Sequence, residues 1–198
     1  MTHMNSPEPV DPTRTALLVM DYQPPVLSLV DNAAELLDRT STAIAQARAA
    51  AVQIVYVRVA FAAQDYAAIP PTNKGFARRA SGGFLDAGTP EADIHPDIAP
   101  QPGDIVVTKT RRGAFSTTNL ANLLNAHRID SLILAGISTS GVVLSTLGDA
   151  ADRDYRMIIL TDCCADPRPE VHRVLMEQVF PAQADLIDTS ALPSLLGR

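Results

Sequence analysis

Short apolar runs recur along the chain, and each is followed by a polar or glycine-containing stretch. A near-continuous apolar run is typical of a parallel strand that is covered on both faces. The runs are TALLVMD (residues 15–21), the segment 52–59, DIVVTK (104–109), SLILAG (131–136), RMIILTD (156–162) and the short ADLID (184–188). The pattern therefore predicts about six strands in a mainly parallel sheet.

Between these runs the apolar residues change to helical spacing. In the segment 32–51, Leu36, Leu37 and Ile44 share one face, which predicts a long surface helix. The same reasoning predicts further helices after a Ser or Thr cap near 116–118, after Gly141, and over 169–180.

Strands that alternate with helices indicate an α/β fold, here a three-layer α/β/α, doubly wound sheet. The 198 residues are enough for one such domain, which we expect to span 13–198. Residues 1–12 are polar and contain proline, so they are expected to form a flexible arm. Pro24 and Pro25 argue against a helix directly after the first strand.

The stretch 60–103 loses both periods and is rich in Pro, Gly and Ala. A loop of this length in a compact domain is usually a lid or a binding loop. Aromatic residues in and near it are candidate pocket walls, although aromatic residues more often pack in a core: Phe61, Tyr66, Phe76, Phe84 and Phe115.

Charge and composition exclude several classes of partner. The net charge is −6 and Lys and Arg form no large cluster, which argues against nucleic-acid binding and against a basic membrane-surface helix. The apolar runs are too short to span a bilayer, and the N-terminus lacks the apolar core of a signal peptide. We therefore expect a cytoplasmic protein with a small-molecule substrate. The adjacent Cys163 and Cys164 fit a reducing compartment and are expected to pack in the core.

Three predicted strands end in residues that could carry chemistry. Asp21 ends the first run, Lys109 ends DIVVTK, and Gly136 begins a turn that leads into a helix. The carboxyl ends of parallel strands are where such sheets bind ligands. There a lysine can keep an aspartate ionised or tune its basicity, while turn amides polarise a bound oxygen. The combination indicates acid/base chemistry.

Four blocks, LLVMDYQ, VVTKTRRGAFSTTNL, LILAGISTSGVVLSTLGDAADRDYR and IILTDCCADPRPEVH, occur in an order and spacing that resemble the isochorismatase-like hydrolase superfamily. The resemblance covers nearly the whole chain. It implies that Asp21 and Lys109 are catalytic. It also implies a cis peptide bond between Ile137 and Ser138, and an oxyanion hole formed by the backbone amides of Ser138 and Val142.

The resemblance also puts a cysteine nucleophile at the position of Val142, and valine cannot form a thioester. The chain thus resembles a branch without the cysteine, which could hydrolyse a vinyl ether or a related C–O or C–N bond with Asp21 and Lys109 alone. Two alternatives stay open. The chain could be an inactive paralogue with a binding or structural role, or an amidohydrolase with a hydroxyl nucleophile such as Ser138, Thr139 or Ser140.

Gln23, Phe115, Thr139 and Ser140 are expected to line the substrate pocket. No cofactor and no metal are predicted, because His3, His95, His127 and His172 are scattered and no phosphate-binding glycine loop occurs. The resemblance also implies a homo-oligomer, either a dimer or a tetramer.

Overall fold

The computed structural model describes residues 7–78 and 83–198. Residues 1–6 of the predicted arm lie outside these ranges. Residues 7–12 do not form a free extension, because Val10 is buried and its backbone N–H donates to the carbonyl oxygen of Leu195 at 2.9 Å. The start of the described chain therefore packs against its C-terminal helix.

In the described part of the chain, six strands form one sheet: β1 (Thr15–Met20), β2 (Gln53–Val59), β3 (Ile105–Lys109), β4 (Ser131–Ile137), β5 (Arg156–Ala165) and β6 (Asp185–Ile187). Their order is β3-β2-β1-β4-β5-β6, and every neighbouring pair is parallel. The predicted doubly wound α/β fold is confirmed. The strand order reverses between β1 and β4, and the crevice beyond the carboxyl ends of these two strands is the usual ligand site of such a sheet.

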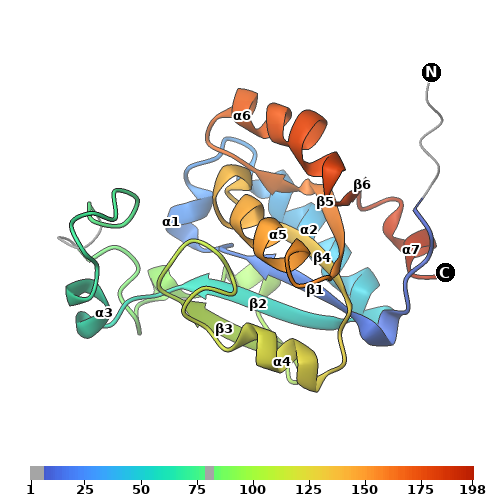
Figure 1. Cartoon of the computed structure of the whole chain (residues 1–198), viewed down its shortest axis with the longest axis horizontal. Coiled ribbons are helices and arrows are strands. Elements are labelled where there is room, and N and C mark those ends of the chain that lie inside the picture. Colours follow the sequence, from blue (N-terminus) through green and yellow to red (C-terminus); the bar gives the residue numbers. More distant parts are fainter. Residues whose placement is uncertain (1–6, 79–82) are drawn as a thin grey trace.

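Helices cover both faces of the sheet (Figure 1). Core residues of α2 and α7 pack on one face, whereas those of α4, α5 and the segment that continues α6 pack on the other. The helices are α1 (Pro24–Leu27), α2 (Ala33–Ala49), α3 (Ala63–Ala67), α4 (Leu120–Ala126), α5 (Leu144–Ala151), α6 (Pro169–Val174) and α7 (Leu192–Leu195). No helix in the described ranges is long and apolar enough to cross a membrane.

Strand β1 shows why the apolar runs form central strands. All six of its residues are buried. Leu17 and Val19 belong to the core under α2, and Leu18 and Met20 belong to the core on the opposite face. Each fully buried side chain of this size stabilises the fold by about 1.5–3 kcal/mol. A polar residue in this strand would lose that contribution on one face or the other.

The long loop, residues 60–103, carries a small apolar core of its own. Phe61, Ile69, Phe76 and Leu85 are buried there together, and the rings of Phe61 and Tyr66 stack with centroids 4.9 Å apart. The loop extends to one side of the sheet, where it includes α3 (left in Figure 1). Its order comes from this cluster of widely spaced residues rather than from a periodic pattern.

Two sequence predictions about proline and cysteine were wrong in detail. Pro24 and Pro25 begin α1 instead of preventing a helix, because the first turn of a helix needs no N–H partner for its leading residues. The run RMIILTD predicted a strand that ends at Asp162, but β5 continues through Cys163 and Cys164, and both are buried free thiols. Their expected packing in the core is confirmed.

Two helix predictions also differ from the structure. The helix predicted over 169–180 is divided into α6, a π-helical turn (Leu175–Val179) and a 3-10 turn (Phe180–Ala182). A proline follows Phe180 and cannot donate a helical hydrogen bond, which fits this break. Helix α4 begins at Leu120, after the predicted cap, although the Thr118 hydroxyl still accepts a hydrogen bond from the Leu120 N–H at 3.2 Å.

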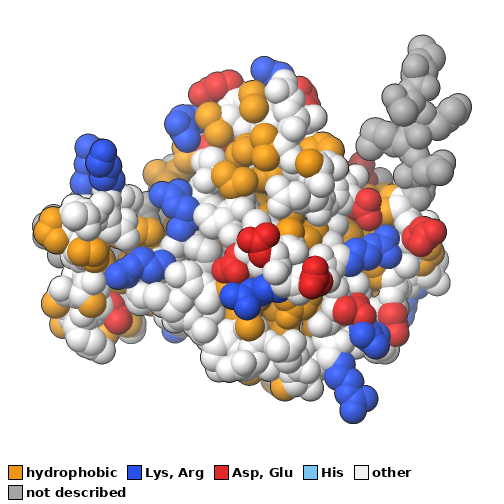
Figure 2. All heavy atoms as spheres, viewed as in Figure 1, with side chains coloured by type: hydrophobic (Ala, Val, Ile, Leu, Met, Phe, Trp, Pro, Cys, Tyr) orange, Lys and Arg blue, Asp and Glu red, His pale blue; other side chains and the backbone are white. Residues whose placement is uncertain are grey.

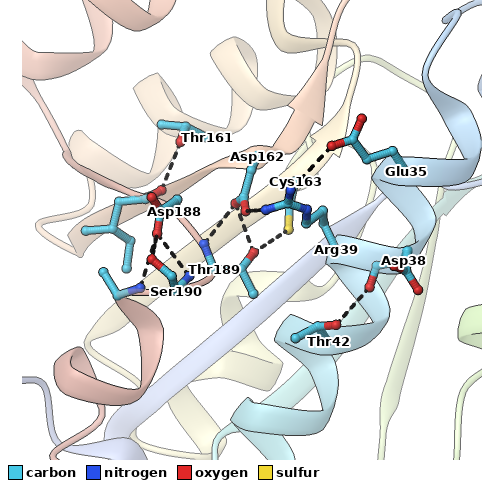
Figure 3. A network of polar contacts seen from close by, with 12 residues as sticks. Glu35, Asp38, Arg39, Thr42, Thr161, Asp162, Cys163, Asp188, Thr189 and Ser190 are labelled. Atoms are coloured by element: carbon cyan, nitrogen blue, oxygen red, sulfur yellow. Dashed lines mark hydrogen bonds and ion pairs between the residues drawn. The ribbon is translucent and has the colours of Figure 1, made fainter.

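A polar network around Asp162 ties the C-terminal segment to β5 and α2 (Figure 3). One oxygen of Asp162 accepts hydrogen bonds from the Thr189 N–H at 3.0 Å and from the Thr189 hydroxyl at 2.9 Å. The other accepts from Arg39 at 3.3 Å. The Asp162 side chain is only 20% exposed and Thr189 is buried, so the two bonds to Thr189 lie largely out of solvent. The network fixes the segment that leads from β6 into α7.

Replacing Asp162 by alanine should destabilise the fold by about 1–3 kcal/mol, because the Thr189 donors lose their buried acceptor. Urea unfolding followed by circular dichroism measures the change. The matched control is Asp38→Ala, an exposed aspartate on α2 whose carbonyl, rather than its carboxylate, accepts the Thr42 hydrogen bond. The control should stay within about 0.5 kcal/mol of the wild type. Equal unfolding midpoints for both variants would contradict a structural role for the network.

Candidate active site

Asp21 and Lys109 meet beyond the carboxyl ends of β1 and β3. Lys109 Nζ lies 2.9 Å from Asp21 Oδ2, and the two side chains are 1% and 10% exposed. Lys109 Nζ also donates to the carbonyl oxygen of Arg111 at 3.2 Å. The amine reaches Asp21 across the end of β2, which separates the two strands. The pair predicted from the strand ends is thus brought together as a buried ion pair.

The backbone at Asp21 turns sharply to present this carboxylate. Its φ is +62°, a left-handed conformation that costs a residue with a side chain about 1–2 kcal/mol. The Asp21 N–H donates to the carbonyl oxygen of Val57 at 2.8 Å, which fixes the turn to β2. Strain of this kind is often held at functional sites.

The turn after β4 forms a second wall of the site. The peptide bond between Ile137 and Ser138 is cis, where the resemblance puts one. A π-helical turn (Thr139–Val143) follows and leads into α5. A β-carbon on Gly141 would lie 2.5 Å from Ser138 Oγ, which is closer than real side chains allow, so any side chain here would displace the Ser138 hydroxyl. Val142 is buried, with its side chain in the core under α5.

Two residues that sequence reasoning did not select hold this turn in place. Asp166, just after β5, accepts a hydrogen bond from the Ser140 N–H at 2.8 Å. His172 on α6 lies with Nδ1 2.8 Å from Thr139 Oγ1. No strand-end signal marks Asp166, because the apolar run RMIILTD predicts a strand that ends at Asp162, whereas β5 continues to Ala165. His172 has no local sequence signal either, because its partner is 33 residues away.

A cavity of about 300 Å³ lies between these elements and the long loop. Its polar and charged lining comprises Asp21, Lys109, Arg112, Ser138, Ser140, Asp166 and Arg168. Its apolar lining includes Val26, Leu29, Val59, Phe76, Phe84, Leu85, Ile137 and Val142. The cavity therefore joins the ion pair, the turn and two of the predicted aromatic walls.

Three residues expected in the pocket do not line this cavity. The buried Gln23 side chain instead donates to the carbonyl oxygens of Val59 and Ala92, both at 2.8 Å, and accepts from the Val59 N–H. Phe115 packs in the core and stacks on Tyr155. Thr139 points to His172 and is fully buried. Of the four predicted pocket residues, Ser140 alone is in the lining.

Neither cysteine supplies a reactive thiolate. Burial raises the pKa of Cys163 to about 11 and raises that of Cys164 still further, so both thiols stay protonated at neutral pH. Neither lines the cavity, although Cys164 borders a neighbouring one of about 310 Å³ together with His172 and Asp166. Within residues 7–78 and 83–198, no three His, Cys, Asp or Glu side chains gather as metal ligands.

Comparison with known proteins decides the family, because residues 15–191 match the Isochorismatase domain. The chain belongs to the isochorismatase family. Family relatives include a ureidoacrylate amidohydrolase (RutB) of Agrobacterium fabrum, 33% identical over 186 residues, with 82% of this chain and 81% of the relative covered. An isochorismatase family protein of Bacillus subtilis (YwoC) is 30% identical over 172 residues, with 87% and 88% covered.

A maleamate amidohydrolase of Pseudomonas putida is 33% identical over 100 residues, a match that spans 50% of this chain and 47% of that relative. The names of these relatives put this isochorismatase-family chain among hydrolases. Its fold resembles the crystal structure of a cysteine hydrolase from Pseudomonas syringae, with a TM-score of 0.88 at 23% identity over 100% of this chain and 99% of that one.

Acidification should destabilise the fold through His172. Burial lowers the pKa of His172, and the Asp166 carboxylate opposes this shift only in part. As the pH falls below about 6.5, the unfolded chain takes up the proton more readily than the folded one. The stabilisation is therefore complete above that pH and is lost below it. Between about pH 7.5 and about pH 5.5, we expect the urea midpoint of the wild type to fall more than that of His172→Gln.

The matched control for this titration is His127→Gln, at the exposed C-terminal end of α4. Its midpoint should fall with pH as the wild-type midpoint does. If His172→Gln also shows the full wild-type fall, His172 is not the group responsible.

Proposed function

We propose that the chain is a small-molecule hydrolase in which Asp21 is the general acid and base and Lys109 is its charge partner. The main support is the buried contact of 2.9 Å between Lys109 Nζ and Asp21 Oδ2 at the wall of the cavity. The position that the resemblance gives to a cysteine nucleophile holds Val142, which has no group that can form a covalent intermediate. Water then attacks the substrate directly.

For a vinyl ether, Asp21 first takes up a proton from solvent and then donates it, as the carboxylic acid, to the terminal carbon of the double bond. Water adds to the resulting oxocarbenium ion, and the hemiketal separates into a carbonyl compound and an alcohol. Asp21 regains a proton from the water during these steps. Lys109 supports the carboxylate form that exists between the two transfers.

For an amide or ureide, Asp21 removes a proton from water as the water attacks the carbonyl carbon, and the same proton is returned to the leaving nitrogen. The backbone amides of Ser138 and Val142 are the proposed donors to the oxyanion. The names of the relatives, ureidoacrylate amidohydrolase and maleamate amidohydrolase, favour this C–N reaction.

Two other functions each have one observation in their favour. Buried apolar Val142 is what an inactive paralogue with a binding role would carry at this position. Ser138 and Ser140 line the cavity, whereas the Thr139 hydroxyl is engaged by His172, so a hydroxyl nucleophile would be one of the two serines. A trapped acyl-serine found by mass spectrometry would support the second alternative.

The predicted homo-oligomer and cytoplasmic location stay predictions. Three large apolar side chains in the described chain, Leu29, Val106 and Val174, are exposed by 52%, 46% and 39%. Val106 lies on the edge strand β3, and an edge strand offers backbone groups that can pair with another copy.

Asp21→Asn should lower turnover about 10²–10⁴-fold, because asparagine cannot transfer the proton. The assay is proton NMR of product formation from isochorismate and from a panel of small amides and ureides. Pyruvate release would identify vinyl-ether hydrolysis, and ammonia release would identify C–N hydrolysis. Asp38→Asn, exposed on α2, is the control and should keep the wild-type rate. Full activity of Asp21→Asn on a substrate that the wild type hydrolyses would overturn the mechanism.

Val142→Cys should create an iodoacetamide-sensitive amidase activity, because the new thiol would lie in the lining of the cavity that contains Asp21 and Lys109. The matched control is Val143→Cys. Val143 is also buried but does not line the cavity, so its thiol should give no activity. Equal amidase activity in the two variants would contradict a specific acyl-transfer position at residue 142.

A further inference from the structure

Arg112 follows β3 and lies where the long loop approaches the turn after β4. A β-carbon on Gly75 of the long loop would lie 3.1 Å from Arg112 Nη2, and one on Gly141 of the turn would lie 3.6 Å from Nη1. The guanidinium group therefore lies between the two, and Arg112 lines the cavity with Asp21 and Lys109. A side chain at Gly75 would crowd this position.

The guanidinium donors of Arg112 have no protein acceptor within residues 7–78 and 83–198, and the side chain is exposed. The neighbouring arginine differs. Arg111 donates to the carbonyl oxygens of Thr110 at 2.7 Å and Ala68 at 3.3 Å, so its donors hold the loop to the body. Of two adjacent arginines, one is used for structure and the other is available to a ligand.

The carboxylates of the cavity do not neutralise Arg112. Asp21 accepts from Lys109, and Asp166 accepts from the N–H groups of Ser140 and Arg168. Arg168 Nε lies 4.0 Å from Asp166 Oδ1, so this carboxylate balances part of the positive charge of Arg168. Three cations thus line the cavity against two engaged carboxylates, on a chain whose net charge is −6.

A cleft lined by one sign of charge concentrates ligands of the opposite sign. Figure 2 shows Lys and Arg side chains around the boundary between the long loop and the rest of the molecule, whereas most Asp and Glu side chains on this face lie over the other half. The surface around the cavity therefore favours an anionic ligand, although the chain as a whole repels one.

We propose that Arg112 is the anion-binding residue of the cavity and that the substrate carries a carboxylate at the end away from the bond that is broken. The planar guanidinium fork matches a carboxylate with two parallel hydrogen bonds. Because Arg112 lies beside Gly141, one residue before the proposed oxyanion donor Val142, we expect only a few bonds between the carboxylate and the reacting carbon. The part of this proposal that concerns the broken bond rests on the proposed function, whereas the anion site at Arg112 does not.

The test is binding rather than turnover, so it does not depend on catalysis. Isothermal titration of the full chain, in wild-type and Asp21→Asn form, compares the monoamides of short dicarboxylic acids, such as succinamate, with their neutral diamides. We expect at least one monoamide to bind about 10-fold or more tighter than its diamide. Arg112→Gln should remove this preference and leave diamide binding unchanged, and Arg112→Lys should keep part of it.

Arg111→Gln is the matched control, since it removes the same charge one residue away and should keep the preference for the monoamide. Urea unfolding checks that Arg112→Gln folds as the wild type does, which is expected because its donors bind no described protein group. The proposal is overturned if no monoamide binds the wild type more tightly than its diamide, or if Arg112→Gln keeps the preference. Loss of turnover in Asp21→Asn with the preference intact would support both proposals separately.

Discussion

The ion pair between Asp21 and Lys109 is the constraint on which the site depends. Both groups are nearly out of solvent, and removing one partner of a buried pair typically costs about 3–5 kcal/mol because the other charge is left uncompensated. The pair requires β1 and β3 to end near each other on either side of β2. In the register, Met20 lies beside Val57 and Lys109 beside Val59, so β3 ends two positions beyond β1 along β2. The left-handed backbone at Asp21 and the cavity both lie at this end of the sheet.

The sequence alone predicted the sheet and the ion pair, and the reason is the same for both. Apolar runs identify strands that are buried on two faces, and a charged residue directly after such a run lies at the edge where ligands bind. Asp21 and Lys109 could therefore be selected without knowledge of their contact. The strand order, which puts β1 beside β4 at the switch point, follows from packing and is not written in any single segment.

The rest of the site depends on contacts between segments that no local pattern connects. Gln23 and Thr139 have the polarity of pocket residues, but their side chains point to backbone and to His172. Arg111 and Arg112 are the same residue type, and only their surroundings in the fold distinguish them. The order of the long loop comes from Phe61, Ile69, Phe76 and Leu85, whose irregular spacing gives no helical or strand period.

Gln23 joins Val59, where β2 ends, to Ala92, far along the long loop. The entropy cost of holding the two ends of a segment together grows only slowly with the length of the segment. We therefore expect insertions or replacements between these two points to disturb the sheet little, provided that the hydrogen bonds from Gln23 to Val59 and Ala92 are kept. Because Phe76, Phe84 and Leu85 of this loop line the cavity, we expect exchange of the loop to change ligand preference, whereas Asp21 and Lys109 lie outside the exchanged segment.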